Sequence, residues 1–230
     1  MRPQDVVVYA LDSFAIHSLR FFLHSAPVGH SCANRGFGLL RPSFRATCMT
    51  RQLQFADWVP FPVARVFAFF SNPENLPRLM PPETQTRIDR LQLIAPPLSP
   101  AEDAPSNRRA AGIGSTITTS FRPFKFLPIR RQWIAAITEF EWNHYFADVQ
   151  QKGPFKRWHH RHEFLPEARN ARSGTLVRDI IEYEVGFGLL GALADSLVVE
   201  RQMRRTFAER QTILPTLLSS SRLRSYETPQ

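Results

Sequence analysis

The chain has 230 residues, of which 43% are hydrophobic and 12% aromatic, and its formal net charge is +9. This composition supplies one sizeable core and excludes an intrinsically disordered protein. No run of apolar residues is long enough to cross a bilayer. All but three of the 29 Lys and Arg residues are arginine, dispersed over many segments and often beside acids. We therefore expect no nucleic-acid binding, and the charge instead favours transient contact with anionic membrane surfaces.

Residues 1–48 differ from the rest of the chain. They contain both cysteines, Cys32 and Cys48, and show little sustained periodicity. Asp5 and Asp12 interrupt the region where a secretory signal needs its apolar core. We interpret this segment as an upstream or disordered extension of a protein whose natural start is Met49.

Three further boundaries follow from composition. The main domain is predicted over residues 49–215, with a flexible loop rich in proline and small residues over 95–112. Residues 216–230 are predicted to form a disordered tail. We expect the protein in the cytoplasm.

The main domain begins with a strand and two short helices. Strand-like alternation covers residues 52–58, and Pro62 then stands where a first helical turn tolerates proline. Large apolar side chains recur at helical spacing over residues 63–70, and Asn72 caps a second short helix. Four further strands are predicted over residues 84–94, 113–121, 129–140 and 144–151.

Residues 153–185 predict a β-hairpin, with the breaker-rich segment 166–174 as its loop. One face of the first strand holds Lys156, Trp158, His160, His162 and Phe164, and His159 lies on the other face. The more apolar face of the second strand holds Thr175, Val177, Asp179, Ile181, Tyr183 and Val185. Strand pairing places Asp179 opposite His160 or His162, so that an acid and an imidazole satisfy each other on the inner face.

The period becomes helical after the glycines at 186 and 188. Leu189, Leu193, Leu197, Glu200, Arg204, Phe207 and Gln211 recur three or four residues apart and predict one stripe of a long helix. Glu200 precedes Arg204 by four residues, which is the favourable order for an ion pair. This pair is either a solvated edge pair or the mouth of a cavity.

These elements predict an α+β domain. A curved antiparallel sheet of about seven strands would pack its concave face against the long C-terminal helix, because each has one apolar face to bury. The chain resembles the START-like, or SRPBCC, superfamily, which has polyketide cyclase/dehydrase and coenzyme Q-binding members. The resemblance covers roughly residues 50–214 and is carried by VPFPVARVFAFFSNPENLPRLMPP, QWIAAITEF, YFADVQQKGPFKRWHHRHEF, GTLVRDIIEYEVGFGLLG and RTFAER.

The resemblance implies a helix-grip fold with a deep pocket between the sheet and the last helix. Such pockets hold lipids, isoprenoids, quinones or polyketides, but the superfamily shares no catalytic residue, so the fold does not decide the function. From strand and helix phase, the residues expected to face the pocket are Trp133, Phe146, Asp148, Trp158, His160, His162, Asp179, Ile181, Tyr183, Leu193 and Leu197. Glu200 and Arg204 are expected at its mouth.

The polar residues of this set permit several interpretations. The favoured one is a buried hydrogen-bond network that fixes the imidazole rings of His160 and His162. Alternatives are contact with a polar ligand group, acid–base catalysis with Asp179, and a metal site completed by Asp179 or Asp148. The metal site is the least favoured of these, so we expect neither a metal nor a cofactor.

The sequence favours a noncatalytic binder or transporter of a hydrophobic small molecule. It has no G-x-S-x-G turn, no phosphate-binding glycine loop and no H-E-x-x-H motif. The alternative is a cyclase or dehydratase in which His160 or His162 acts as the base and Asp179 orients it. Neither the ligand nor the oligomeric state follows from the sequence.

Overall fold

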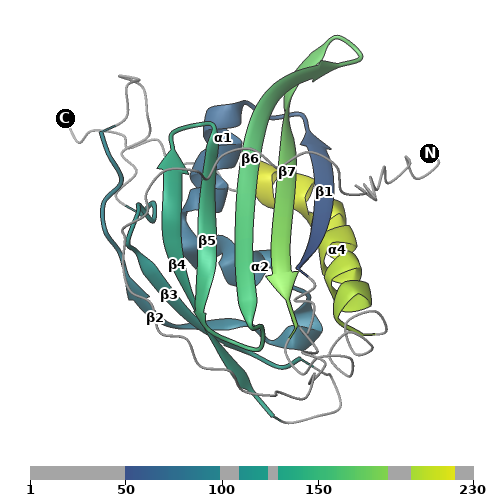
Figure 1. Cartoon of the computed structure of the whole chain (residues 1–230). Coiled ribbons are helices and arrows are strands. Elements are labelled where there is room, and N and C mark those ends of the chain that lie inside the picture. Colours follow the sequence, from purple (N-terminus) through teal and green to yellow (C-terminus); the bar gives the residue numbers. More distant parts are fainter. Residues whose placement is uncertain (1–49, 99–108, 124–128, 186–197, 221–230) are drawn as a thin grey trace, which may run out of the picture.

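The computed structural model describes residues 50–98, 109–123, 129–185 and 198–220 (Figure 1). Its strands form one antiparallel seven-stranded sheet in the order β1-β7-β6-β5-β4-β3-β2. The strands are β1 (Arg51–Val59), β2 (Arg87–Gln92), β3 (Thr116–Phe121), β4 (Arg131–Glu141), β5 (Tyr145–Lys152), β6 (Arg157–Arg169) and β7 (Arg172–Glu184). Consecutive strands pair from β2 to β7, and β1 then pairs with β7.

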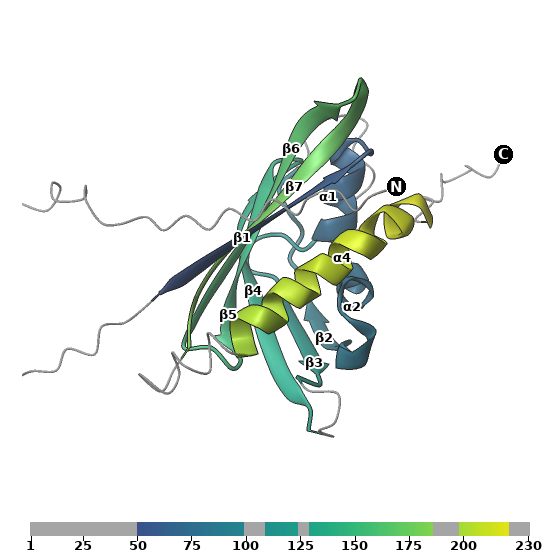
Figure 2. The ribbon, with the colours of Figure 1, turned by 90° about the vertical axis from the view of Figure 1, so that its right-hand side faces the viewer.

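The helices lie on one side of the sheet, and α4 crosses that side diagonally (Figure 2). They are α1 (Val63–Ser71), α2 (Leu76–Leu79) and α4 (Glu200–Ser220), with 3₁₀ turns η1 (Pro73–Asn75) and η2 (Pro82–Thr84). The predicted α+β helix-grip architecture is thus confirmed, including the short helices after the first strand. Among the described residues, no helix combines the length and the apolar character needed to cross a membrane.

The β6–β7 hairpin is longer than predicted. The two strands pair as far as Arg169 and Arg172, so the turn contains only Asn170 and Ala171. Both have positive φ angles, 49° and 58°. Two such residues form a tight turn whose twist matches that of the flanking strands. The predicted loop over residues 166–174 is therefore wrong for most of its length, because strand pairing outweighs the turn-forming composition.

Helix α4 continues beyond the predicted end of the domain at residue 215 and reaches Ser220. Leu214 and Leu218 are four residues apart and fully buried, and they belong to the same core cluster as Phe67 of α1. Burial of Leu218 stabilises the last turn of the helix beyond Pro215. The prediction of a disordered tail is therefore wrong for residues 216–220. The predicted extension over 1–48 lies outside the described residues.

The core on the helix side of the sheet has two parts. The α1 cluster is built from Val59, Val66, Phe67, Phe70, Phe146, Phe164, Val177, Leu214, Leu218 and their buried neighbours. The Tyr183 cluster contains Leu53, Phe55, Ile181 and Tyr183, with Phe155, Trp158, Met203 and Phe207 packed against them. Each of β1, β6, β7 and α4 contributes to both clusters, which therefore lie at different levels along the same elements.

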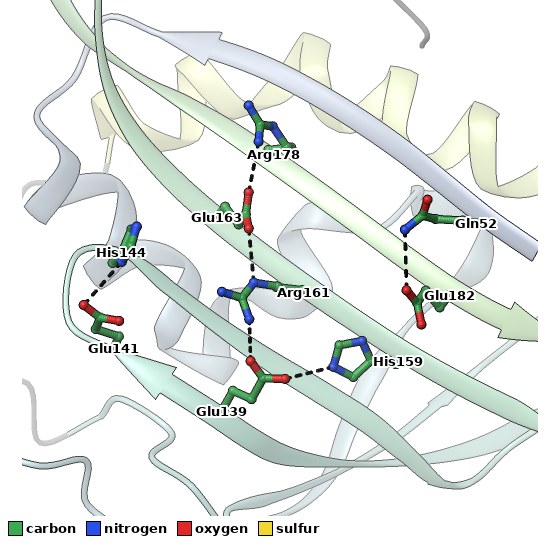
Figure 3. Close-up of polar contacts among 9 residues, drawn as sticks. All are labelled: Gln52, Glu139, Glu141, His144, His159, Arg161, Glu163, Arg178 and Glu182. Carbon is green, nitrogen blue, oxygen red and sulfur yellow. Dashed lines mark hydrogen bonds and ion pairs between the residues drawn. The ribbon is translucent and has the colours of Figure 1, made fainter. Parts of the chain in front are cut away.

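The opposite face of the sheet carries a row of charged side chains (Figure 3). Arg161 contacts Glu139 at 2.5 Å and Glu163 at 3.1 Å, and Arg178 reaches Glu163 at 3.3 Å. His159 Nε2 lies 3.2 Å from Glu139. His159 therefore lies on the face away from α4, as the strand alternation predicts.

Candidate functional site

A layer of ionisable side chains separates the two core clusters. We call it the polar layer, and it comprises Asp57, Asp148, His160, His162, Asp179 and Arg210. On β7, Asp179 stands between Val177 of the α1 cluster and Ile181 of the Tyr183 cluster. Alternation of side chains along each strand thus brings one or two polar groups to the same level on neighbouring elements.

Asp179 is the centre of this layer and is fully buried. The direct cross-strand partner of Asp179 is His162, whereas His160 pairs with Ile181. His160 nevertheless reaches Asp179, with Nε2 3.0 Å from Oδ1. His162 Nδ1 lies 2.7 Å from the same oxygen, at an angle too poor for a directed hydrogen bond. The predicted pairing of acid and imidazole therefore involves both histidines rather than one.

Arg210 of α4 holds the other side of Asp179. Its Nη2 donates to Asp179 Oδ2 and, over 2.8 Å, to Asp57 Oδ2 of β1. The guanidinium carbon also lies 4.5 Å from the centre of the Phe207 ring, close enough for a cation–π interaction. Only 5% of Arg210 is exposed. This residue joins the terminal helix to two strands of the sheet.

Sequence reasoning missed both Asp57 and Arg210. The packed stripe of α4 passes through Met203, Phe207, Arg210, Leu214 and Leu218. The predicted stripe is therefore right at Phe207 but wrong at Arg204 and Gln211. Spacings of three and four residues around Arg210 are the signal that could have found it, because they place a charge between apolar side chains. In β1 the corresponding signal has a period of two, because Asp57 stands between the buried side chains of Phe55 and Val59.

The charges of the polar layer shift its protonation equilibria. Burial alone raises the pKa of Asp179, but Arg210 and the two imidazoles more than offset it and hold that pKa well below its usual range. For Arg210, burial is outweighed by Asp179 and Asp57, and the pKa of the guanidinium is raised. Burial raises the pKa of Asp57 despite the adjacent Arg210. Asp179 and Arg210 are therefore charged, and they hold each other in the interior.

The part of the layer farther from Arg210 is less enclosed. The side chains of His160, His162 and Asp148 remain 12%, 13% and 15% exposed. His160 Nδ1 lies 3.8 Å from Asp148 Oδ2. Burial and the neighbouring His162 lower the pKa of His160, whereas burial raises the pKa of Asp148. These three side chains can contact a bound molecule without opening the core.

Aromatic rings adjoin this accessible part. The Trp133 and Trp158 rings are 4.9 Å apart and nearly perpendicular, and Phe155 lies 5.0 Å from Trp158. We call these three half-buried rings the aromatic wall. Trp158 Nε1 is buried, and the indole lowers the pKa of Asp148. Among the described residues, however, no acceptor lies in hydrogen-bonding geometry to Nε1. The wall joins the polar layer through the contact between Trp158 and His160, whose rings are 5.9 Å apart.

Other residues predicted for the site have different positions. Phe146 is only 7% exposed, and Ile181 and Tyr183 are fully buried, so all three belong to the packed core. Leu193 and Leu197 lie outside the described residues.

The predicted pair at the mouth does form at the start of α4. Arg204 Nη2 lies 2.7 Å from Glu200 Oε1, and Arg51 of β1 reaches Glu200 at 3.4 Å. All three side chains are partly exposed, which fits the interpretation of a solvated edge pair.

A solvent-open hollow of about 410 Å³ shares only Trp158 with the aromatic wall, and it is lined by Val149, Gln150, Lys156, Arg157, Trp158, His159 and Glu182. It contains neither Asp148 nor His160. Several of its lining residues belong to the face away from α4, so we do not assign the candidate site to it.

Comparison with known proteins identifies the family. Residues 59–212 match the family described as polyketide cyclase / dehydrase and lipid transport. No curated protein matches the sequence. Among solved structures, TTHA0849 from Thermus thermophilus is similar with a TM-score of 0.51 and 18% identity, over 74% of this chain and 100% of that one.

Two further structures are similar at lower scores. A START superfamily protein from Mycobacterium smegmatis has a TM-score of 0.46 and 15% identity, over 73% of this chain and 97% of that one. Norcoclaurine synthase from Thalictrum flavum has a TM-score of 0.48 and 12% identity, over 81% and 98%. At these identities, structural similarity describes the fold and not the activity.

Proposed function

Because this chain belongs to the polyketide cyclase/dehydrase and lipid transport family of the START-like superfamily, we propose that it binds a hydrophobic small molecule without transforming it. The ligand class is a lipid, an isoprenoid or quinone, or a polyketide-like molecule. One observation carries the proposal: the half-buried aromatic wall meets the accessible part of the polar layer on the helix side of the sheet. The ligand therefore combines an apolar body with at least one polar group.

The two parts of this surface have complementary roles. The rings of the aromatic wall are only partly buried, and a ligand that covers them gains about 25 cal/mol for each Å² of apolar surface removed from water. Trp133, Phe155 and Trp158 also offer faces and edges to a flat ring system. His160 and His162 can donate or accept a hydrogen bond, and ionised Asp148 accepts only. A few polar groups in a mainly apolar site are typical of small-molecule binding.

Native mass spectrometry of the full chain, followed by solvent extraction, tests for a co-purified ligand. Titration with a fluorescent naphthalene sulfonate then compares variants. We expect Trp133→Leu to weaken binding of this probe by about tenfold, equivalent to about 1.4 kcal/mol. The matched control is Trp58→Leu, because Trp58 lies on β1 away from the aromatic wall and donates to Glu167 O. Equal losses in both variants, or no extractable compound and no probe binding by folded protein, would refute the proposal.

Acid–base catalysis is the second candidate, and a specific geometry favours it. His160 lies between two carboxylates, 3.0 Å from Asp179 and 3.8 Å from Asp148. An imidazole oriented by a carboxylate is a common general base, and a neutral one is ready to accept a proton. A cyclase or dehydratase reaction on a carbonyl-rich apolar substrate would use such a base to remove a proton next to a carbonyl group.

Deuterium exchange distinguishes the two candidates. An aryl 1,3-diketone incubated with the protein in D₂O should exchange its acidic carbon-bound hydrogen faster than in buffer alone if His160 acts as a base. His160→Gln should abolish the acceleration while His159→Gln retains it. A rate that is the same with and without protein would exclude this chemistry and leave noncatalytic binding.

Contact with anionic membranes remains a prediction from the net charge of +9. Co-sedimentation with phosphatidylserine vesicles should decrease steeply as salt rises, because exposed charges are screened over about 8 Å at physiological ionic strength. Binding that does not respond to salt would contradict the electrostatic explanation.

A further inference from the structure

We propose that Asp148, His160 and His162 form a binding site for a divalent first-row transition-metal ion. Each side chain offers one ligand atom, and these atoms lie within 4.8 Å of one another. The inference goes beyond the binding of a hydrophobic molecule and does not rest on it. It also differs from the expectation drawn from the sequence, which favoured no metal.

The spacing needs only a small contraction around an ion. Ligand atoms about 2.0 to 2.1 Å from a tetrahedral metal are about 3.4 Å apart. The separations between these ligand atoms, which are 4.8 Å at most, would therefore have to shorten by about 1.4 Å at most. The three residues occupy two neighbouring strands, with Asp148 directly paired to His160 and His162 two residues farther along β6. Side-chain rotation can supply the movement while the strand pairing is kept.

Asp179 already orients both imidazoles for this role. It contacts Nε2 of His160 and Nδ1 of His162, which leaves the opposite nitrogen of each ring for a metal. His160 Nδ1 is the nitrogen that faces Asp148. His162 Nδ1 lies 2.7 Å from Asp179 Oδ1, so Nε2 is the ring nitrogen directed away from that carboxylate. Metal-binding histidines usually direct their second nitrogen to a carboxylate in this way, which fixes the ring.

The charge of the polar layer also favours a cation. Among the described residues, the layer holds three carboxylates and a single guanidinium, that of Arg210. Arg210 pairs with Asp57 and Asp179, so Asp148 has no cationic side chain of its own while the imidazoles are neutral. A divalent ion next to Asp148 would balance the remaining negative charge where solvent screening is weak.

The donor set defines the type of ion and the space around it. Two imidazoles and one carboxylate suit zinc or ferrous ions rather than calcium or magnesium, which prefer oxygen ligands. Three protein ligands leave at least one coordination position for water or a bound molecule. All three side chains are partly exposed, so this position is accessible to solvent.

Titration of tag-free, chelator-treated full-length protein with Co²⁺ tests the site. We expect one ion per chain, visible d–d absorption of a nitrogen and oxygen site, and competition by Zn²⁺. His162→Gln and Asp148→Asn should each weaken binding by about 100-fold or more, because even residues behind the ligands contribute about 10- to 100-fold. The matched control is His159→Gln, which alters an imidazole of the same strand on the opposite face and should bind as the wild type does.

Three outcomes would overturn the proposal. The first is the absence of stoichiometric Co²⁺ or Zn²⁺ binding by folded wild-type protein. The second is an equal loss in His159→Gln and in both ligand variants, with near-ultraviolet circular dichroism confirming the fold of each. The third is a thiolate charge-transfer band as the main Co²⁺ signal, which would assign the ion to Cys32 or Cys48. If the first of these outcomes is found in wild-type protein that still binds the naphthalene probe, this proposal fails and the proposed function stands.

Discussion

Replacement of Arg210 by methionine is the most direct test of how the polar layer is held together. Arg210 is 5% exposed and bonds to both Asp57 and Asp179. Methionine keeps the length and apolar character of the side-chain stem but leaves two buried carboxylates without their cation. Removing one partner of a buried ion pair lowers the free energy of unfolding by about 3 to 5 kcal/mol, because the other charge stays buried without compensation. We expect Arg210→Met to lower the free energy of unfolding by this amount at pH 7 to 8.

The loss of unfolding free energy in Arg210→Met should depend on pH, and its direction follows from the carboxyl pKa shifts. In the wild type, the depressed pKa of Asp179 contributes stability above its unfolded value of about 3.9, and this contribution is lost as pH falls toward the folded value. Without Arg210, burial raises the folded pKa of both Asp57 and Asp179. A raised carboxyl pKa costs stability at high pH, and protonation relieves that cost at lower pH. The difference between variant and wild type should therefore shrink from pH 8 to pH 5.

Urea unfolding followed by far-ultraviolet circular dichroism measures both quantities. The matched control is Arg205→Met on the same helix, since Arg205 is 60% exposed and pairs with Glu209 at 2.8 Å. Exposed pairs of this kind contribute little to stability, because solvent screens the charges and ordering two long side chains costs entropy. If Arg210→Met costs no more than Arg205→Met, or if its cost does not change between pH 8 and pH 5, the account of a buried charge network is incorrect.

Three further changes test other contacts of the fold. Gly174→Ala should destabilise by about 1 to 3 kcal/mol in urea unfolding, because a Cβ would meet the Trp58 ring at 2.5 Å. Phe207→Ala removes a ring stacked 4.0 Å from Phe55 and should cost about 2 to 4 kcal/mol in the same assay. Arg161→Gln on the outer face should cost about 1 kcal/mol or less, and the cost should fall at 1 M NaCl; a larger, salt-independent cost would contradict a solvated role.

Strand periodicity was sufficient to predict much of the candidate site. Side chains alternate between faces with a period of two, so the positions of Trp158, His160 and His162 follow once β6 is recognised. The same rule placed Asp148 and Asp179 on the helix side. Periodicity does not report depth, however. Phe146, Ile181 and Tyr183 share that side but are packed in the core, because side chains of α4 and neighbouring elements cover them.

The buried face of the helix was harder to predict, because the predicted stripe took its phase from Leu189, Leu193 and Leu197. A stripe drawn from Leu189 through Glu200 and Arg204 reaches Gln211 and passes beside Arg210. An arginine also suggests solvent exposure when it is considered alone. Its burial depends on Asp57 and Asp179, which are 153 and 31 residues away in the sequence. Long-range pairing of this kind has no local signal beyond the apolar neighbours of each charge.

Arg210 explains why Asp57 and Asp179 are tolerated in the interior, but it does not explain Asp148. Burial raises the pKa of Asp148, and a carboxyl with a raised folded pKa costs stability at every pH above its unfolded value. Asp148→Asn should therefore stabilise the protein by about 1 kcal/mol at pH 7, with the gain vanishing near pH 4.

The same Asp148→Asn variant should lose Co²⁺ binding, so stability and function would change in opposite directions. Urea unfolding at both pH values and the Co²⁺ titration provide the two measurements. A residue that serves only the fold would instead destabilise the protein when replaced. Destabilisation of Asp148→Asn at pH 7 would therefore show that Asp148 supports the structure, and it would remove the main reason to assign this carboxylate to a bound cation or ligand.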